Sequence, residues 1–274
     1  MLRQRVITAV VLVPLVLGVT LFAPQWLFDA VVGVALVLLA LEFAALCGLA
    51  FAGRALFAAA VVAVFAMAAV PWTHADETGR ALLAGAVIFW LLAPLWLATR
   101  PVLPAAVKLL LGIVMLAGAG VALHGLKRID GGGLWILFAF VIVWAADIGG
   151  YAAGRAFGRH KLAPSISPGK TWEGFGGGVV LVLAAGAAAA FRFVDESAWL
   201  AWGILLVALA VFSVIGDLLE SLLKRQAGVK DSGRLLPGHG GLLDRLDSLL
   251  AVAPLFLFAG SRIGIFRELS CCGL

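Results

Sequence analysis

Long runs of apolar residues, separated by short polar segments, cover most of the 274-residue chain. A helix needs roughly 20 consecutive apolar residues to cross the hydrocarbon core of a bilayer. By this measure the pattern predicts nine membrane-spanning helices, at residues 5–23, 27–48, 55–72, 81–98, 105–125, 133–150, 175–193, 198–220 and 248–265. The first run follows Arg3 and Arg5 but ends without a small-residue cleavage pattern, so we expect an uncleaved anchor.

The composition agrees with this pattern and excludes a soluble globular protein. Hydrophobic residues make up 64% of the chain and charged residues 13%, and the mean hydropathy is +1.12. We therefore expect an all-α integral membrane protein. Its net charge of +5 is explained by basic cytoplasmic loops, so we expect no nucleic-acid partner. The three cysteines lack metal-ligand spacing, which argues against a zinc site or a disulfide framework.

The distribution of basic residues predicts the orientation of the helices. With the N-terminus inside, fourteen of the twenty Lys and Arg residues fall in inner segments and six in outer segments. Basic residues are enriched in cytoplasmic loops, so the chain is expected to be N-in and C-out. The two long inner segments, residues 151–174 and 221–247, then lie on the same face of the membrane.

One acidic residue, Glu42, falls inside the second predicted span. An ionisable side chain is costly at that depth and faces either a partner or a cavity. We favour a structural pairing role, although the sequence does not identify the partner.

The first polar segment is "WAADIGGYAAGRAFGRHKLAPSISPGKTWEGFGGG", residues 144–178. Its glycines at 150, 154 and 158 form a small-residue stripe that allows another helix to approach closely. The cations that follow, together with "SPGKT", suit a ligand rich in anionic oxygens. Positive-inside topology alone would explain these cations equally well. "SPGKT" is not a phosphate-binding Walker loop, because the first glycine of that motif and a preceding strand are missing.

The second polar segment begins at the end of the eighth predicted span, where we expect the helix to run on through "VIGDLLESLLKRQ", residues 214–226. Asp217, Glu220, Ser221 and Lys224 fall on one face of a helix, and Asp217 lies at a depth where its charge needs a partner. Carboxylate oxygens such as those of Asp217 and Asp244 are the ligands that Mg²⁺ prefers. Capping of the ninth helix is an alternative role for the acids that follow, more so for Asp247 than for Asp244.

The run "SLLKRQAGVKDSGRLLPGHGGLLDRLD", residues 221–247, resembles the signature of the phosphatidate cytidylyltransferase (CDP-diacylglycerol synthase) family. The matching positions are Ser221, Lys224, Arg225, Lys230, Asp231, Gly233, Pro237, His239, Gly240, Gly241, Asp244, Arg245 and Asp247. The first polar segment is similar to the family's other polar segment, with one departure, a glycine at 169 where many members carry lysine. The detailed resemblance covers residues 144–178 and 217–250.

The resemblance implies transfer of CMP from CTP to phosphatidate in phospholipid biosynthesis, with release of pyrophosphate. It implies that Asp217 and Asp244 hold Mg²⁺, with K⁺ as a candidate companion ion. The expected catalytic residues are Asp217, Asp244, Lys224, Arg225, His239 and Asp247. The expected substrate-binding residues are Lys230, Asp231, Arg245, Ser221, Arg155, Tyr151, Ser167, Lys170, Thr171 and Asp147. For His239, assisting departure of pyrophosphate and holding the glycine turn are equally open roles.

On this interpretation, residues 1–130 form an N-terminal transmembrane scaffold and residues 131–274 a C-terminal catalytic region. We expect a protein of the bacterial inner membrane whose active site faces the cytoplasm. The expected partners are CTP, phosphatidate and membrane lipids. A homodimer is compatible with the glycine stripe, which packs helices within one chain just as readily. The alternatives are a CTP-dependent polyprenol or phytol kinase and, in a different class, a cation-coupled transporter.

Overall fold

The computed structural model describes residues 13–69, 77–233, 235 and 240–266, and almost all of them are helical. A short apolar helix at Val13–Phe22 precedes the longer ones. The remaining elements are α2 (Gln25–Leu46), α3 (Phe51–Ala69), α4 (Glu77–Thr99), α5 (Ala105–Arg128), α6 (Gly132–Phe157), β1 (Lys161–Ala163), β2 (Ser167–Thr171), α7 (Trp172–Phe193), the 3₁₀ helix η1 (Glu196–Ala198), α8 (Trp199–Gln226) and α9 (Leu243–Arg262).

Seven helices, α2 to α8, are long and apolar enough to cross a membrane, which is what an integral membrane protein requires. The predicted count of nine is not confirmed. Residues 5–12 of the first predicted span lie outside the described residues, and its described part is the short helix Val13–Phe22. The ninth corresponds to α9, whose first turns carry Asp244, Arg245 and Asp247, so that it is too charged to count among the seven.

Two helices extend well beyond the spans predicted for them. α6 continues to Phe157, beyond the end predicted at residue 150. α8 continues past its span to Gln226, and the predicted continuation of this helix through the polar face is confirmed. Hydropathy detects where the apolar run ends, whereas the backbone hydrogen bonds of a helix continue through polar residues of good helix propensity. These two extensions carry much of the polar chemistry of the chain.

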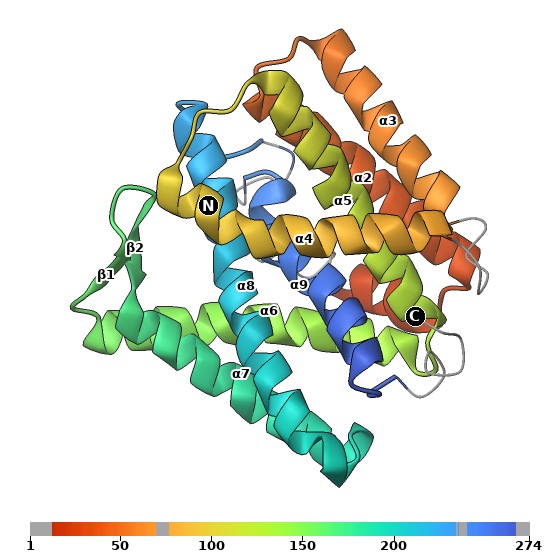
Figure 1. The fold of residues 1–274 in the computed structure, drawn as a ribbon, viewed down its shortest axis with the longest axis vertical. Helices are drawn as coiled ribbons and strands as arrows, with labels where there is room; N and C mark the ends of the chain where they lie inside the picture. Colours follow the sequence, from red (N-terminus) through yellow and green to blue (C-terminus); the bar gives the residue numbers. More distant parts are fainter. Residues whose placement is uncertain (1–12, 70–76, 234, 236–239, 267–274) are drawn as a thin grey trace.

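Gly149 and Gly150, the second of which belongs to the glycine stripe, pack α6 against α7 within the chain. A side chain at Gly149 would overlap the backbone of Gly177, and one at Gly174 would lie 2.7 Å from the carbonyl oxygen of Gly150. Such close backbone contact is the usual result of small residues facing each other across a helix pair. A two-stranded antiparallel hairpin, β1 and β2, lies at one end of this pair and connects the C-terminal end of α6 to the N-terminal end of α7 (Figure 1).

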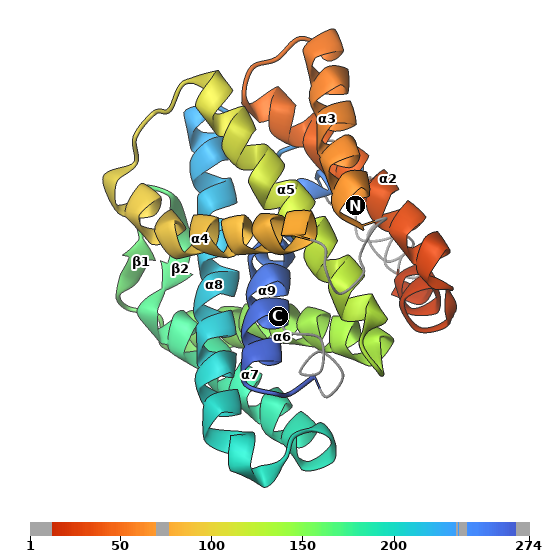
Figure 2. The same ribbon diagram turned by 45° about the vertical axis from the view of Figure 1, so that its right-hand side comes forward.

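Two helices run across the α8–α9 pair. α8 and α9 pack side by side, and α4 and α6 run across them (Figures 1 and 2). An aromatic cluster of Trp135, Phe138, Trp202 and Phe256 fills the junction of α6, α8 and α9. At the other end of the α8–α9 pair, Gly216 touches the backbone of Asp247 and Ser248, which keeps the two polar helix ends together.

Candidate active site

Asp244 lies in the first turn of α9 and organises the second polar segment. Its Oδ1 accepts a hydrogen bond from Lys224 Nζ at 2.6 Å. Its Oδ2 accepts from the backbone N–H groups of Ser232 and Gly241, at 2.9 and 2.8 Å, and from Ser232 Oγ at 3.0 Å. Burial acts to raise the pKa of Asp244, but these hydrogen bonds, above all that from Lys224, outweigh it and lower the pKa to about 2.

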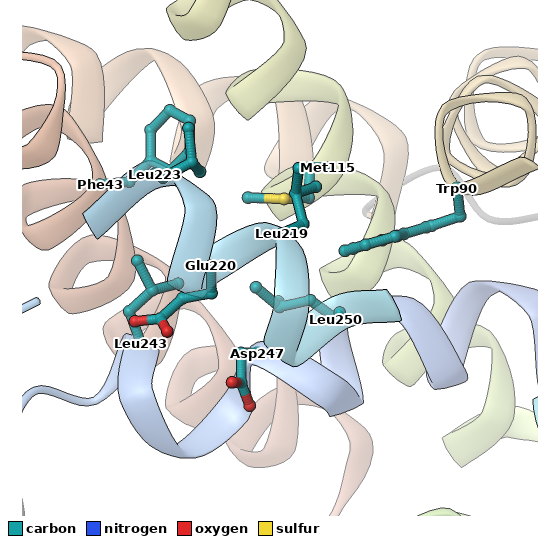
Figure 3. Close-up of a pocket in the computed structure, with 10 residues that line it drawn as sticks. Phe43, Trp90, Met115, Leu219, Glu220, Leu223, Leu243, Asp247 and Leu250 are labelled. Atoms are coloured by element: carbon teal, nitrogen blue, oxygen red, sulfur yellow. The ribbon is translucent and has the colours of Figure 1, made fainter. Parts of the chain in front are cut away.

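Lys224 lies between two carboxylates. Besides Asp244, it forms an ion pair with Glu220 one helical turn earlier, where Nζ is 2.5 Å from Oε2. Glu220 is only 5% exposed, and its Oε1 is buried without a hydrogen-bond partner. Glu220 and Asp247 contribute to the lining of a mainly apolar cavity that is enclosed by residues of α2, α4, α5, α8 and α9. Figure 3 shows both carboxylates in the lower part of the view, with Phe43 above them at the left and Trp90 at the right.

Asp217 connects the two polar segments. Its Oδ2 lies 2.6 Å from Nζ of Lys170, which belongs to β2 of the hairpin, and its Oδ1 accepts from Ser221 Oγ at 3.3 Å. The expectation that Asp217 needs a cationic partner is confirmed. This ion pair brings residues 167–171 to the polar end of α8.

Two further acids and one arginine surround Asp217. The charges of Asp217 and Asp147 both act on Asp247, and the charge of Arg245 acts on Asp147. Burial, followed by the negative charge of Asp217, raises the pKa of Asp247. Within the described residues, no three His, Cys, Asp or Glu side chains form a preassembled metal cluster. The acids are therefore close enough to influence one another but do not by themselves complete a coordination shell.

The other predicted site residues occupy different environments. Arg225 donates to the carbonyl of Ile166 at 3.4 Å, which ties α8 to the tip of the hairpin. Arg155 donates to the hydroxyl of Tyr151 at 2.8 Å on the exposed end of α6. Ser167 is partly buried in β2, and Lys230 and Asp231 are exposed. His239 lies outside the described residues.

Thr171 has a role that the sequence analysis did not anticipate. It was expected to contact substrate, but its side chain is buried and caps α7 by accepting a hydrogen bond from the N–H of Gly174 at 3.1 Å. The Thr171 hydroxyl therefore stabilises the start of α7.

Three residues that contact the Asp244 network were missing from the predicted site. Glu220 could have been found, because it shares a helical face with Asp217 and Lys224. Glu42 was noticed as an acid within an apolar span, and the structure supplies its partners at the start of α9. Ser232 carried no signal, since its importance depends on a contact with α2.

Carboxylates and cations gather at the polar ends of α8 and α9, in a chain whose helices are long and apolar enough to cross a membrane, and this defines a membrane protein with a charged site. Comparison with known proteins identifies the family. The model of the Cytidylyltransferase family matches residues 3–261, and the chain belongs to that family.

Curated relatives agree with this assignment. The phosphatidate cytidylyltransferase of Pseudomonas aeruginosa is 41% identical over 263 residues, which cover 93% of this chain and 96% of the relative. The enzymes of the same name from Haemophilus influenzae and Staphylococcus haemolyticus are 50% and 53% identical over 131 and 123 residues. These matches cover 45% and 44% of this chain, and 44% and 46% of the respective relatives. The family resemblance found in the two polar segments is thereby confirmed.

Proposed function

We propose that this protein transfers the cytidine monophosphate group of CTP to phosphatidate, giving CDP-diacylglycerol and pyrophosphate. One observation carries the proposal at the level of the site. Two lysines, one from each polar segment, form ion pairs at the adjoining ends of α8 and α9. Lys170 Nζ lies 2.6 Å from Asp217 Oδ2, and Lys224 Nζ lies 2.6 Å from Asp244 Oδ1. A site of this kind offers several cations to a triphosphate and a lipid phosphate together.

The reaction needs no nucleophile from the protein. A phosphate oxygen of phosphatidate attacks the α-phosphorus of CTP, and a new P–O bond forms there. The bond from that phosphorus to the oxygen bridging the β-phosphate breaks, and pyrophosphate leaves with the electron pair. Catalysis must therefore come mainly from positioning the two substrates and neutralising their charge.

The side chains suited to this task are the basic residues of both segments. Lys170 and Lys224 are already held near the acids, so a triphosphate would compete with the carboxylates for them. Arg225 braces the hairpin tip against α8. The clamps that we propose for the triphosphate and the lipid headgroup are Lys170, Lys224, Arg225, Lys230, Arg155 and Arg245.

We further propose that Asp217 and Asp244 hold Mg²⁺, with K⁺ as a candidate companion. Their carboxylate oxygens fit Mg²⁺, which commonly takes one or two protein carboxylates and completes its shell with substrate phosphates and water. A preassembled three-residue cluster is therefore unnecessary. The chemistry that a bound metal supplies is neutralisation of charge on the reacting and leaving phosphate oxygens. Asp147 and Asp247 lie close enough to Asp217 for their negative charges to add to the attraction for the metal ion.

The location of the site is also part of the proposal. We place it on the cytoplasmic side of a bacterial inner membrane, because the polar segments are rich in basic residues and CTP is a soluble nucleotide. The acyl chains of phosphatidate can then remain in the bilayer while the headgroup enters the site.

The test is formation of CDP-diacylglycerol from labelled CTP and phosphatidate by the purified protein in mixed micelles. We expect product with Mg²⁺, none after chelation, and about a hundredfold slower turnover in Asp217→Asn. Asp29→Asn is a matched control, because Asp29 is an acid on α2 that pairs with His124 at 2.9 Å. A folded wild-type protein that instead phosphorylates a free lipid alcohol, or conducts a cation-coupled flux, would overturn the proposal.

A further inference from the structure

A buried acid from the N-terminal part of the chain contacts the second polar segment directly. Glu42 on α2 is 9% exposed. Its Oε1 accepts from the backbone N–H of Leu242 at 3.0 Å, and its Oε2 accepts from the N–H of Leu243 at 2.8 Å. Ser232 Oγ also donates to Oε2, at 3.0 Å. One carboxylate therefore holds three donors that lie about 200 residues away in the sequence.

Two of these donors belong to the start of α9. The first N–H groups of a helix have no partner within the helix and need one from elsewhere. The residue before α9, Leu242, has no side chain that could serve as a cap. Glu42 takes that role from another helix, and a negative charge at a helix N-terminus is favourable.

The same turn is shared between Glu42 and Asp244. Three consecutive N–H groups are divided between them: that of Gly241 donates to Asp244, and those of Leu242 and Leu243 donate to Glu42. The hydroxyl of Ser232 lies 3.0 Å from an oxygen of each acid, and it has one proton to donate to either. Displacing one carboxylate therefore disturbs the donors of the other.

The local glycines show how tightly the turn encloses this carboxylate. A side chain at Gly233 or Gly241 would overlap the Glu42 carboxyl group. Gly240 adopts a left-handed conformation, with φ of 83°, and a Cβ there would lie 2.8 Å from Asp244 Oδ2. The absence of side chains at these three glycines therefore leaves the space that the Glu42 and Asp244 carboxylates occupy.

We propose that Glu42 is a positioning residue of the active site. It fixes the backbone of residues 241–243, which in turn aims the Asp244 carboxylate at Lys224. Glu42 acts through Asp244 and need not touch substrate. This inference rests on the proposed cytidylyl transfer, but it assigns a role in that reaction to a residue of the region expected to be scaffold.

Glu42→Gln tests the proposal, because the amide keeps the shape but brings an NH₂ group against backbone donors. We expect kcat per folded protein to fall about 10- to 100-fold, the half-saturating Mg²⁺ concentration to rise several-fold, and KM for CTP to change less. Glu42→Asp keeps the charge with a shorter reach and should recover part of kcat. Asp29→Asn, the same kind of change on the same helix, should leave these values unchanged.

Hydrogen exchange provides a readout that is independent of activity. The amides of Leu242 and Leu243 should exchange at least tenfold faster in Glu42→Gln, while amides in α5 and α6 keep their protection. In the double variant with Ser232→Ala, the loss of kcat should be smaller than the product of the two single losses, since both act on one network.

Three results would overturn the inference: unchanged kcat and Mg²⁺ dependence in Glu42→Gln, multiplicative losses in the double variant, or a loss that merely follows the folded fraction. If Glu42→Gln does not fold, an Asp variant with unchanged kcat and unchanged exchange at Leu242 and Leu243 would overturn it equally. Absence of CDP-diacylglycerol formation by the folded wild type would instead remove the proposed function, and faster exchange at these two amides would still show that Glu42 holds the turn.

Discussion

The two polar segments of this protein are stabilised in different ways. The first forms a hairpin whose strands pair Lys161 with Thr171 and Ala163 with Ser167. Between α8 and α9, the described part of the second segment has little regular structure, and N–H groups there donate to the carboxylates of Asp244 and Glu42. In the hairpin, backbone pairing fixes the conformation, while the charges are carried by side chains that do not take part in that pairing. In the second segment, the carboxylates that carry the charge also hold the backbone in place, so replacing one acid changes both the charge and the backbone conformation.

The largest effect should follow removal of the charge on Asp244. Asp244→Asn breaks the pair with Lys224 and places an amide among donors from Ser232 and Gly241. We expect turnover to fall about a thousandfold and the free energy of unfolding to fall by roughly 3 kcal/mol, because a mostly buried ion pair loses one partner. Labelled-CTP assays and thermal unfolding in detergent measure the two quantities. Near-normal turnover would show that the turn keeps its shape without this charge.

A smaller effect is expected for the ion pair that joins the two segments. Lys170→Met removes the partner of Asp217 but leaves the strand pairing of the hairpin intact. We expect kcat/KM for CTP to fall about 10- to 100-fold, while the free energy of unfolding changes by less than about 1 kcal/mol, because the pair is partly exposed.

Lys161→Met is the matched control for this change, since it removes an exposed cation from the neighbouring strand. Steady-state kinetics with varied CTP should give a lower kcat/KM for Lys170→Met than for Lys161→Met. Equal losses in both would indicate that the hairpin contributes only its overall charge and that the position of Lys170 is unimportant.

The same contrast explains what could be predicted from the sequence. The seven helices α2 to α8 were predictable, because each contains a run of apolar residues as long as a bilayer is thick. The β-hairpin was not, since strands of three and five residues are too short to show a periodic pattern. The end of α6 was misplaced because hydropathy does not report where backbone hydrogen bonding ends. The end of α8 at Gln226 was predicted correctly, because its polar residues continue along one helical face.

For the candidate site, the sequence showed which residues need a partner more readily than which residues form the contacts. The cost of a charge near the membrane was enough to predict that Asp217 and Glu42 need partners. It could not identify Lys170 or the amides of Leu242 and Leu243, because those contacts depend on how distant helices cross. The role of Thr171 as a helix cap was hidden for another reason: a threonine before an acidic residue fits either a cap or a phosphate ligand.

The smallest effect is expected where a carboxylate supports a segment that already holds its own shape. Glu173 accepts from the N–H groups of Arg159 and His160, at 3.1 and 3.2 Å, and lies 2.6 Å from His160 Nδ1. Glu173 therefore resembles Glu42 in accepting hydrogen bonds from backbone N–H groups, but the hairpin next to it is also held by its own strand pairing. Glu173→Gln should lower kcat by no more than about threefold, as expected for exposed interactions. Glu196→Gln, in η1 at the other end of α7, is the control for loss of one exposed charge. A loss in Glu173→Gln as large as that in Glu42→Gln would show that the hairpin, too, depends on a single carboxylate for the geometry of the site.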